Sequence, residues 1–508
     1  MIKIFARLEK IRGITFLILT SFIFFLFRLP SFFEPYWYGD EGIYQVLGMA
    51  MRRGSLLYRD IWDNKPPLLY TLYAIFNSDQ FTIRIVSAIF GILTIFIFFK
   101  LTEELFLNQR LSSHDKKNQN IVYITTFIFA VLFGLPLLEG NIANSENFML
   151  LPITLAALLI NKSVHSYKNI TLALTGFFLS LAFLFKVVAI FDFSAFLFFL
   201  IIINFAKEKK YNVLKTVNKL IPFFIGFVAP ILLITLFFII NGAFWDFFNA
   251  SFKQNVGYIG YGNKLIIPQG LLLIKLILLA FVIIFLFVKR HAFSASAIFI
   301  ILWFSFSVFN AFFSQRPYTH YMLVLLPSFI LLFGYIFSNP SLRKENTQTL
   351  LSSPKKISAV FLIIVLFLLI KNFNFYEKTS GYYQNFISFI TMKKNVTDYR
   401  SFFDRNTPKD YELAQFIKLH SKPEDKIFIW GNNAQLYKLT NKLPPGRYTV
   451  AYHITASKDT LEETEKSLEK AKPRYIVVSS SASLTPFNLT IYNQKIIISN
   501  AIVYERIF

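Results

Sequence analysis

Long apolar runs alternate with short polar loops along most of the chain. The runs that are long enough, or nearly so, to cross a hydrocarbon layer of roughly 30 Å number about eleven. They cover residues 11–29, 81–101, 121–138, 147–160, 171–185, 188–204, 220–240, 269–288, 293–312, 321–337 and 357–371. We therefore predict an α-helical polytopic membrane protein with about eleven transmembrane helices. A further apolar piece at 66–76 is too short to cross, so an interfacial or re-entrant helix is expected there.

The pattern changes after the last apolar run. Short β-like runs at 426–431, 474–480 and 495–499 alternate with helix-like segments at 410–420 and 457–472. Strands that alternate with helices are typical of an α/β fold. The sequence thus predicts two domains, a transmembrane domain at residues 1–371 and a small α/β tail domain at residues 372–508.

Composition supports a membrane protein. Of the 508 residues, 55% are hydrophobic and only 16% are charged, which is too apolar for a soluble globular chain. The net charge of +23 raises the question of a nucleic-acid partner. However, the Lys and Arg residues lie in short loops between apolar runs rather than on one face or stripe, so no nucleic acid is expected. With no Cys, the chain has no disulfide and no thiolate metal site.

The basic loops predict the orientation. With the N-terminus in the cytoplasm, the most basic loops, at 116–117, 162–168, 207–219, 289–291 and 342–356, all lie on the cytoplasmic face, as the positive-inside rule requires. The loops at 36–70, 139–147, 186–192, 241–264 and 314–321 then lie outside, together with the tail domain. We expect a multi-pass protein of the inner (plasma) membrane with an extracytoplasmic C-terminal domain.

The first outer loop carries many charges for so apolar a chain. Its stretch DEGIYQVLGMAMRRG has apolar residues at helical spacing, two acids in its first turn and Gly54 just past its end. A short amphipathic helix on the membrane surface is expected. The acids, Asp40 and Glu41, are also what a helix cap and a helix dipole require, so the pair alone does not establish chemistry. Lys65 precedes two prolines and therefore lies outside a regular helix.

The whole stretch YGDEGIYQVLGMAMRRGSLLYRDIWDNKPPL resembles the first outer loop of the C-type (GT-C) glycosyltransferases. It is most similar to bacterial relatives of the dolichyl-phosphate-mannose-protein mannosyltransferases, glycosyltransferase family 39, where an Asp-Glu pair, an amphipathic helix, a Gly and Lys-Pro-Pro-Leu recur in this order. The segments NIANSENFMLLP, LFKVVAIFDF and QRPYTHYMLVLLP look like the later outer-loop signatures of the family, and FIWGNNAQLYKLTNKLPPGRY resembles its tail domain. The resemblance implies a GT-C-type fold with catalysis in the transmembrane domain.

The resemblance also implies an activity. The family moves a sugar from a polyprenyl-phosphate donor to an acceptor hydroxyl of a lipid, glycan or protein on the extracytoplasmic face, with inversion, and membrane lipids are further partners. By analogy Asp40 would be the general base, and Glu41 would support it or orient the acceptor. Four cationic side chains would bind the donor phosphate: Lys65, Arg316, His320 and Lys186. A carboxylate can accept a proton and cations can stabilise a leaving phosphate, so these residue types suit the reaction, and no metal or cofactor is implied.

Other polar residues of the outer loops are candidates for substrate binding. They are Asp60, Asp63, Glu139, Asn144, Glu146 and Tyr321. All these candidates have structural interpretations too. Acids beside the arginines of the first loop can pair with them, and polar residues at the start of a span can cap a helix. Lys186 can snorkel to the interface, whereas His320 and Arg316 suit an aromatic belt that anchors a helix.

Other membrane functions remain open on the sequence alone. A secondary transporter also has many spans, but it places ionisable residues at the bilayer midplane. Here the span interiors are nearly free of charge, apart from Arg84 near one helix start. A polyprenyl-linked glycan flippase or polymerase is a closer alternative, although neither is expected to combine the Asp-Glu pair, the Lys-Pro-Pro motif and a tail domain.

The predicted orientation can be tested by labelling. A single Cys in place of Ser457 should react with a membrane-impermeant thiol reagent in intact cells or spheroplasts, whereas a Cys in place of Ser353 should not. The natural chain has no Cys, so the background is clean. Labelling of the second position but not of the first would invert the proposed topology.

Overall fold

The chain folds into two compact units, each assembled from three stretches of sequence. The computed structural model describes residues 2–107, 116–207, 213–255, 266–313, 318–338, 354–373, 375, 378–479, 485–498 and 501–507. The first unit comprises Met1–Leu29, Ser87–Phe237 and Asn255–Thr379, and the second comprises Pro30–Val86, Phe238–Gln254 and Ser380–Phe508. The first outer loop therefore belongs to the same unit as the tail. Our division at residue 371 followed the apolar pattern along the chain and did not anticipate this grouping.

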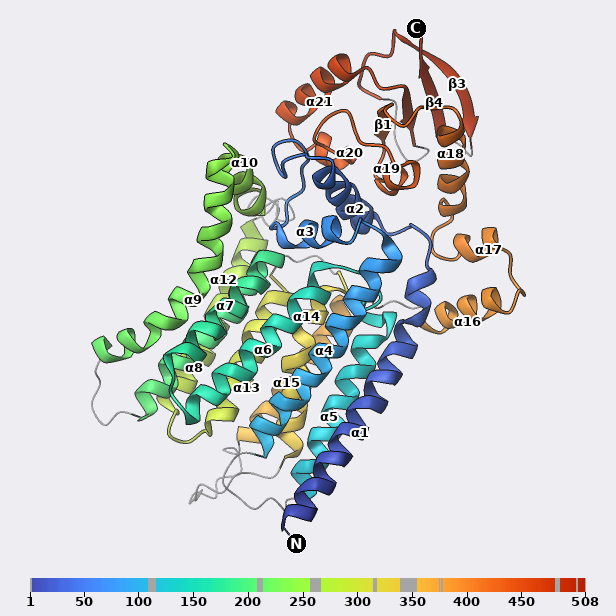
Figure 1. The fold of residues 1–508 in the computed structure, drawn as a ribbon. Helices are drawn as coiled ribbons and strands as arrows, with labels where there is room; N and C mark the ends of the chain where they lie inside the picture. The colour runs from blue at the N-terminus through green and yellow to red at the C-terminus, as the bar shows by residue number, and fades with distance from the viewer. Residues whose placement is uncertain are drawn as a thin grey trace. The chain divides into compact units, whose positions relative to one another are not determined.

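The first unit is a bundle of helices (Figure 1). They are α1 (Ile2–Arg28), α5 (Lys116–Gly134), α6 (Ser145–His165), α7 (Asn169–Phe185), α8 (Ile190–Lys207), α9 (Val213–Ile240), α12 (Ile266–Val288), α13 (Ala295–Ala311), α14 (Tyr321–Phe337) and α15 (Pro354–Asn372). The helix α4 (Gln80–Phe106) begins in the second unit and continues in the first. Short 3-10 turns, η2 (Pro136–Leu138) and η3 (Val187–Ala189), precede α6 and α8. Each apolar run identified in the sequence falls on one of these helices, so the predicted α-helical polytopic architecture is confirmed.

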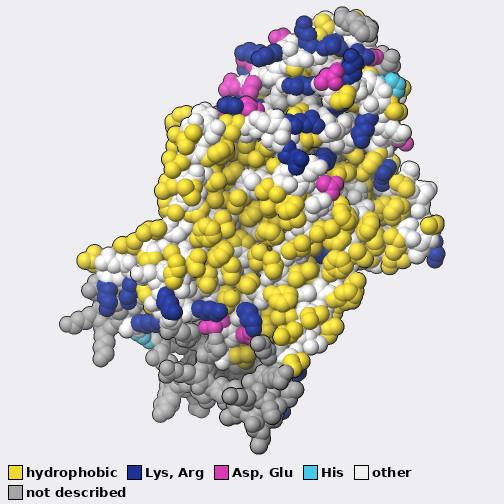
Figure 2. Space-filling model, viewed as in Figure 1, with side chains coloured by type: hydrophobic (Ala, Val, Ile, Leu, Met, Phe, Trp, Pro, Cys, Tyr) yellow, Lys and Arg dark blue, Asp and Glu magenta, His cyan; other side chains and the backbone are white. Residues whose placement is uncertain are grey.

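The surface of this unit is suited to lipid. Within the described residues, five segments are long and apolar enough to cross a membrane: Ile11–Phe33, Gln80–Phe106, Ser145–Val164, Val187–Lys207 and Val213–Ile240. Leu233 and Phe281 are 68% and 65% exposed, and Figure 2 shows a broad hydrophobic face. Water would not tolerate so large an apolar face, but a bilayer does. The protein is therefore a multi-pass membrane protein, while the count of about eleven spans stays a prediction.

The second unit contains a four-stranded sheet in the order β1-β2-β4-β3. The strand β1 (Ile427–Trp430) pairs in parallel with β2 (Tyr475–Val478), whereas β4 (Ala501–Arg506) pairs antiparallel with β2 and with β3 (Tyr492–Ile498). Every residue of β1 and β2 is buried. Side chains of these two strands form a hydrophobic core with Ile454 and Leu468, which lie on neighbouring helices. The helices of the tail are α16 (Thr379–Ile390), α17 (Val396–Ser401), α18 (Thr407–Leu419), α19 (Gln435–Thr440), α20 (Ala451–Ile454) and α21 (Lys458–Ala471). The predicted C-terminal α/β region is confirmed, with β4 as an additional strand.

The first outer loop forms part of the second unit. It contains η1 (Leu29–Phe33), α2 (Gly39–Arg52) and α3 (Leu68–Ile75), and α3 is the short helix expected at 66–76. The segment that follows α9 adds α10 (Phe244–Phe248) and the π-helical turn η4 (Asn249–Lys253). Trp62 from the loop packs against the aromatic core of the tail, which includes Phe428, Trp430 and Tyr448. Loop and tail thus share one hydrophobic core.

The helix α2 is covered on several sides. Every residue from Glu41 to Ala50 is buried, since α3 and α19 both pack against α2. The approach is closest at two glycines: a Cβ at Gly42 would lie 2.7 Å from the backbone nitrogen of Gln435, and one at Gly48 would lie 2.8 Å from that of Ala74. The helix predicted here is present, but the burial of the face that meets α19 was not expected. The tail covers that face, which the sequence pattern of the loop alone could not reveal.

Candidate active site

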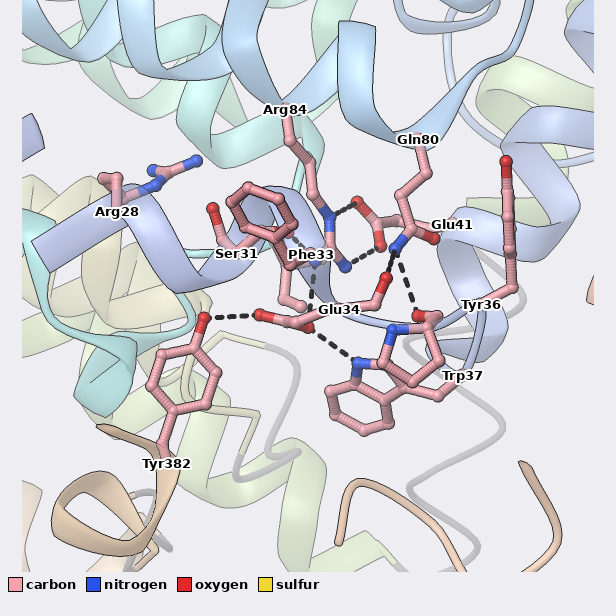
Figure 3. Close-up of polar contacts among 12 residues, drawn as sticks. Arg28, Ser31, Phe33, Glu34, Tyr36, Trp37, Glu41, Gln80, Arg84 and Tyr382 are labelled. Atoms are coloured by element: carbon pink, nitrogen blue, oxygen red, sulfur yellow. Dashed lines mark hydrogen bonds and ion pairs between the residues drawn. The ribbon is translucent and has the colours of Figure 1, made fainter. Parts of the chain in front are cut away.

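A buried ion cluster fixes the start of α2 (Figure 3). The guanidinium of Arg84 donates to both carboxylate oxygens of Glu41 at 3.1 and 2.5 Å, and it lies 2.9 Å from Oε2 of Glu34. All three side chains are at most 1% exposed. Glu34 also accepts hydrogen bonds from Trp37 at 2.7 Å and from Tyr382 at 2.6 Å. These donors satisfy the second carboxylate, so one buried cation can hold two buried anions.

The two neighbouring acids of the loop have different surroundings. Successive residues of an α-helix point about 100° apart, so Glu41 faces Arg84 in the interior while the side chain of Asp40 is 40% exposed. The N-cap residue of α2 is Tyr38, and Asp40 lies in the first turn. The structure therefore excludes the interpretation of Asp40 as a helix cap. It leaves Asp40 accessible to a solute and Glu41 inaccessible.

Asp40 and Asp63 both lie beside the same cation. The ammonium Nζ of Lys65 lies 3.8 Å from Oδ2 of Asp40 and 3.7 Å from Oδ2 of Asp63. It also lies 4.8 Å from the centroid of the Tyr44 ring, and the Tyr44 hydroxyl donates to Oδ2 of Asp40 at 3.0 Å. The side chains of Asp63 and Lys65 are 3% and 17% exposed. The accessible carboxylate of Asp40 thus lies beside the partly accessible ammonium of Lys65, and the buried carboxylate of Asp63 lies beside the same ammonium.

Two buried tyrosines hold the backbone and the buried acid of this group. The Tyr70 hydroxyl donates to Asp63 at 2.6 Å and accepts the backbone N–H of Lys65 at 3.1 Å, and the Tyr58 hydroxyl donates to the carbonyl of Lys65 at 2.7 Å. Burial, helped by the charge of Asp63, raises the pKa of Tyr70 and of Tyr58 well above the ordinary value. Both phenols therefore keep their protons and act as donors. Hydrogen bonds thus fix both the backbone N–H and the carbonyl of Lys65, as expected for a residue whose side chain must keep one position.

Asp60 does not join this group. It accepts two hydrogen bonds from Arg59, at 2.9 and 3.1 Å, and its carboxylate also accepts the backbone N–H of Leu56. The hydrogen bond from Arg59 is the main reason why the pKa of Asp60 is lowered from its ordinary value. The alternative interpretation, that one of the two loop aspartates merely pairs with an arginine, therefore describes Asp60, while Asp63 pairs with Lys65.

The first unit contains a second polar cluster. His320, just before α14, places Nδ1 3.0 Å from Oε2 of Glu139, and the Thr319 hydroxyl donates to the other oxygen of Glu139. Glu139 has a left-handed backbone with φ of 58°, which is uncommon for a residue other than Gly, Asn or Asp and costs conformational energy. The same histidine lies 3.9 Å from Glu146 through Nε2. It therefore bridges two carboxylates of the segment that joins α5 to the first turn of α6.

Lys186 completes this second cluster. Its ammonium forms an ion pair with Glu146 and lies 4.5 Å from the centroid of the Tyr321 ring. This repeats the pattern of Lys65, a lysine between a carboxylate and a tyrosine face. Asn144 is the N-cap residue of α6, although its side chain does not cap the helix. Arg316 lies outside the described residues.

The two clusters contain most of the sequence candidates and some residues that the sequence did not single out. Tyr44, Tyr58 and Tyr70 were missed because a tyrosine in an aromatic-rich chain gives no distinctive signal. Arg84 was noticed as a charge near a helix start, but its partners were not predictable from the pattern. In the part of the chain that the structure describes, no group of three or more His, Asp or Glu side chains is arranged to hold a metal ion.

Known structures with this fold exist. A scan against family models finds no match, and a search of curated proteins finds none either. The crystal structure of ArnT from Cupriavidus metallidurans in the apo state matches with a TM-score of 0.54 and 12% identity over 97% of this chain and 98% of that chain. The crystal structure of ArnT from the same organism bound to undecaprenyl phosphate gives a TM-score of 0.50 and 13% identity over 97% of each chain. This likeness confirms the predicted GT-C-type fold, while the narrower resemblance to family 39 stays a prediction.

The ion cluster around Arg84 predicts a large stability effect. Replacement of Arg84 with Met keeps the length of the side chain but leaves two carboxylates buried without their cation. The free energy of unfolding should fall by about 3 to 5 kcal/mol, as measured when one partner of a buried pair is removed. Thermal unfolding of the purified protein in detergent would show the loss.

A matched control lies on the same helix. Lys100 pairs with Glu103 at 2.7 Å, but its side chain is 57% exposed. Replacement of Lys100 with Met should cost less than about 1 kcal/mol, because exposed pairs contribute little. Equal losses in the two variants would show that the buried cluster does not stabilise the fold in the way described.

Proposed function

We propose that this protein is an integral-membrane glycosyltransferase that moves a sugar from a polyprenyl-phosphate donor to an acceptor hydroxyl, with inversion at the anomeric carbon. The observation that carries the proposal is the pair formed by Asp40 and Lys65, an accessible carboxylate 3.8 Å from a cation whose backbone is anchored. A proton acceptor and a phosphate ligand are the two groups that this reaction requires. The fold shared with ArnT, which was crystallised with undecaprenyl phosphate, supports the choice of donor.

The exposure of each acidic side chain of the loop decides which of them can serve as the general base. A general base must reach the hydroxyl that it deprotonates. The side chain of Asp63 is 3% exposed and that of Glu41 is 1% exposed, and each is engaged by a cation. Asp40, at 40% exposure, is the carboxylate that an acceptor can approach. We therefore assign the base to Asp40 and the role of support to Glu41, which positions the first turn of α2 through Arg84.

The reaction then follows from the charges. The donor phosphate competes with Asp40 for the ammonium of Lys65, so donor binding releases the carboxylate at the moment when a base is needed. The acceptor oxygen attacks the anomeric carbon and its proton passes to Asp40, while the bond to the phosphate oxygen breaks and that electron pair stays on the phosphate. Lys65 stabilises the added negative charge. A phosphate leaves without a general acid.

The remaining candidates are assigned by analogy. We propose that Lys186 and His320 also bind phosphate and that Glu139, Glu146 and Tyr321 hold them, since the carboxylates and the ring contact these cations. Arg316 keeps its predicted role from the resemblance. The acceptor, whether lipid, glycan or protein, and the extracytoplasmic location are part of the same proposal. Mass spectrometry of lipid-linked sugars and surface glycans, with and without the gene, would identify donor and acceptor.

Replacement of Asp40 with Asn tests the base. Asn has nearly the same size, and the position is a partly exposed first turn rather than a cap, so the protein should fold normally. Asn does not accept a proton at neutral pH, and the transfer rate should therefore fall by about 10² to 10⁴. The rate, the protein level and the thermal stability need to be measured together.

Asp60→Asn is the matched control, because it makes the same change in the same loop on a residue that pairs with Arg59. Its transfer rate should stay within about twofold of the parent, since general-base catalysis does not involve it. Full activity of folded Asp40→Asn would remove this carboxylate from the mechanism.

Replacement of Lys65 with Ala tests the phosphate ligand. A charge-assisted hydrogen bond contributes roughly 1.5 to 3 kcal/mol, so the KM for the donor should rise by at least about tenfold while the KM for the acceptor changes little. Lys458→Ala is a suitable control, because Lys458 is a surface residue of the same unit and is 88% exposed. A donor KM that is equal in parent and Lys65→Ala would refute the assignment.

A further inference from the structure

A histidine of the tail lies against the buried acid of the loop cluster. His453, in α20, is 7% exposed, and its Nε2 lies 3.6 Å from Oδ1 of Asp63. Its ring contacts Trp62 edge to face at a centroid distance of 4.9 Å, and the backbone N–H of Trp62 donates to the carbonyl of Arg447 at 2.9 Å. Residues 447–454 of the tail thus meet the loop directly before Lys65. All these residues belong to the second unit.

The protonation state of this histidine follows from its surroundings. Burial lowers the pKa of His453 to about 4, against the raising effect of Asp63 and Asp40 and with the help of Lys65, so the ring is neutral at neutral pH. The atom Nδ1 is buried and has no hydrogen-bond partner in the described part of the structure. A proton on Nδ1 would be a buried, unsatisfied donor, whereas a proton on Nε2 faces a carboxylate. The favoured tautomer therefore presents its N–H to Asp63.

Asp63 divides its two oxygens between different partners. Oδ1 faces His453, while Oδ2 accepts the hydroxyl of Tyr70 at 2.6 Å and lies 3.7 Å from the ammonium of Lys65. A carboxylate that is 3% exposed has little water to compensate its charge, so the hydrogen bond from Tyr70 at Oδ2 and the His453 ring facing Oδ1 at 3.6 Å together favour one orientation of its plane. The position of the lysine ammonium then depends on the orientation of this acid.

We propose that His453 is a positioning residue, which orients the Asp63 carboxylate and thereby holds the Lys65 ammonium beside Asp40. The inference rests on the proposed function, in which Lys65 binds the donor phosphate. His453 itself touches neither phosphate nor sugar in this scheme. The tail contributes to donor binding through the orientation of one loop carboxylate, in addition to covering α2.

Binding of undecaprenyl phosphate to the purified full-length protein tests this role. His453→Phe keeps a ring against Trp62 but has no N–H to face Asp63, and its dissociation constant should rise by about 3- to 10-fold, the range expected for loss of one polar contact to a buried carboxylate. His453→Gln keeps an N–H at a similar reach and should stay within about twofold of the parent. His420→Phe, a change of an exposed tail histidine in the turn after α18, should leave the affinity unchanged.

A double-mutant cycle separates positioning from general support of the fold. If His453 acts through Lys65, the change to Phe should cost less than about twofold in a Lys65→Ala background. An equal loss in both backgrounds, or parent-like affinity of folded His453→Phe, would overturn the inference. Should His453→Phe not fold, as judged by thermal unfolding, His453→Met makes the same comparison.

The proposed function has its own separate failure. A parent protein that does not bind undecaprenyl phosphate, or a Lys65→Ala variant that binds it as tightly as the parent, would overturn the phosphate assignment and this inference with it. Weaker binding by Lys65→Ala together with unchanged binding by His453→Phe would overturn the positioning role alone.

Discussion

The organisation of the first outer loop depends on one buried cation. Arg84 lies at the start of α4 with its side chain fully buried, and removal of a guanidinium from water is costly unless anions meet it. Glu34 and Glu41 supply those anions from either side of the chain segment that leads into α2. Because the segment is held at both points, the first turn of α2 has one orientation. The direction in which Asp40 points is a consequence of this cluster.

The pair of acids in this turn illustrates how one dipeptide can divide two tasks. On a helix, adjacent side chains cannot share a face, so an Asp-Glu pair at a buried helix start presents one acid inward and the other outward. Glu41 compensates Arg84, and Asp40 contacts Lys65 and Tyr44 at a partly exposed position. The hydrogen bonds from Trp37 and Tyr382 to Glu34 also stabilise this cluster, since they allow the single guanidinium of Arg84 to compensate two carboxylates.

The sequence was a good guide where local pattern decides the structure. Apolar runs marked the helices of the first unit, and α3, α18, α21 and the strands β1, β2 and β3 arose where their patterns indicated. The strand β4 was missed although it is longer than β1 and β2, because its run AIVYER follows closely on the run at 495–499 and was not separated from it. The resemblance of the loop to a known motif singled out Asp40 and Lys65, and Asp63 and Tyr44, which contact them, lie in the same loop. The contact that backs Asp63, by contrast, comes from a distant segment. Nothing near His453 in the sequence indicates that it meets Asp63, about 390 positions earlier, and the burial of α2 likewise depends on α19.

Two glycines of α2, Gly42 and Gly48, limit how this protein can diverge. At Gly42 and Gly48 the helix lies so near to Gln435 and Ala74 that even a methyl group would meet backbone atoms. Backbone cannot move aside as a flexible side chain can, so a larger residue at either position requires a matching shift of α19 or α3. The loop and the tail must therefore be inherited together. A tail exchanged from a distant relative would need to bring its own first loop, although more than 300 residues separate the two in the sequence.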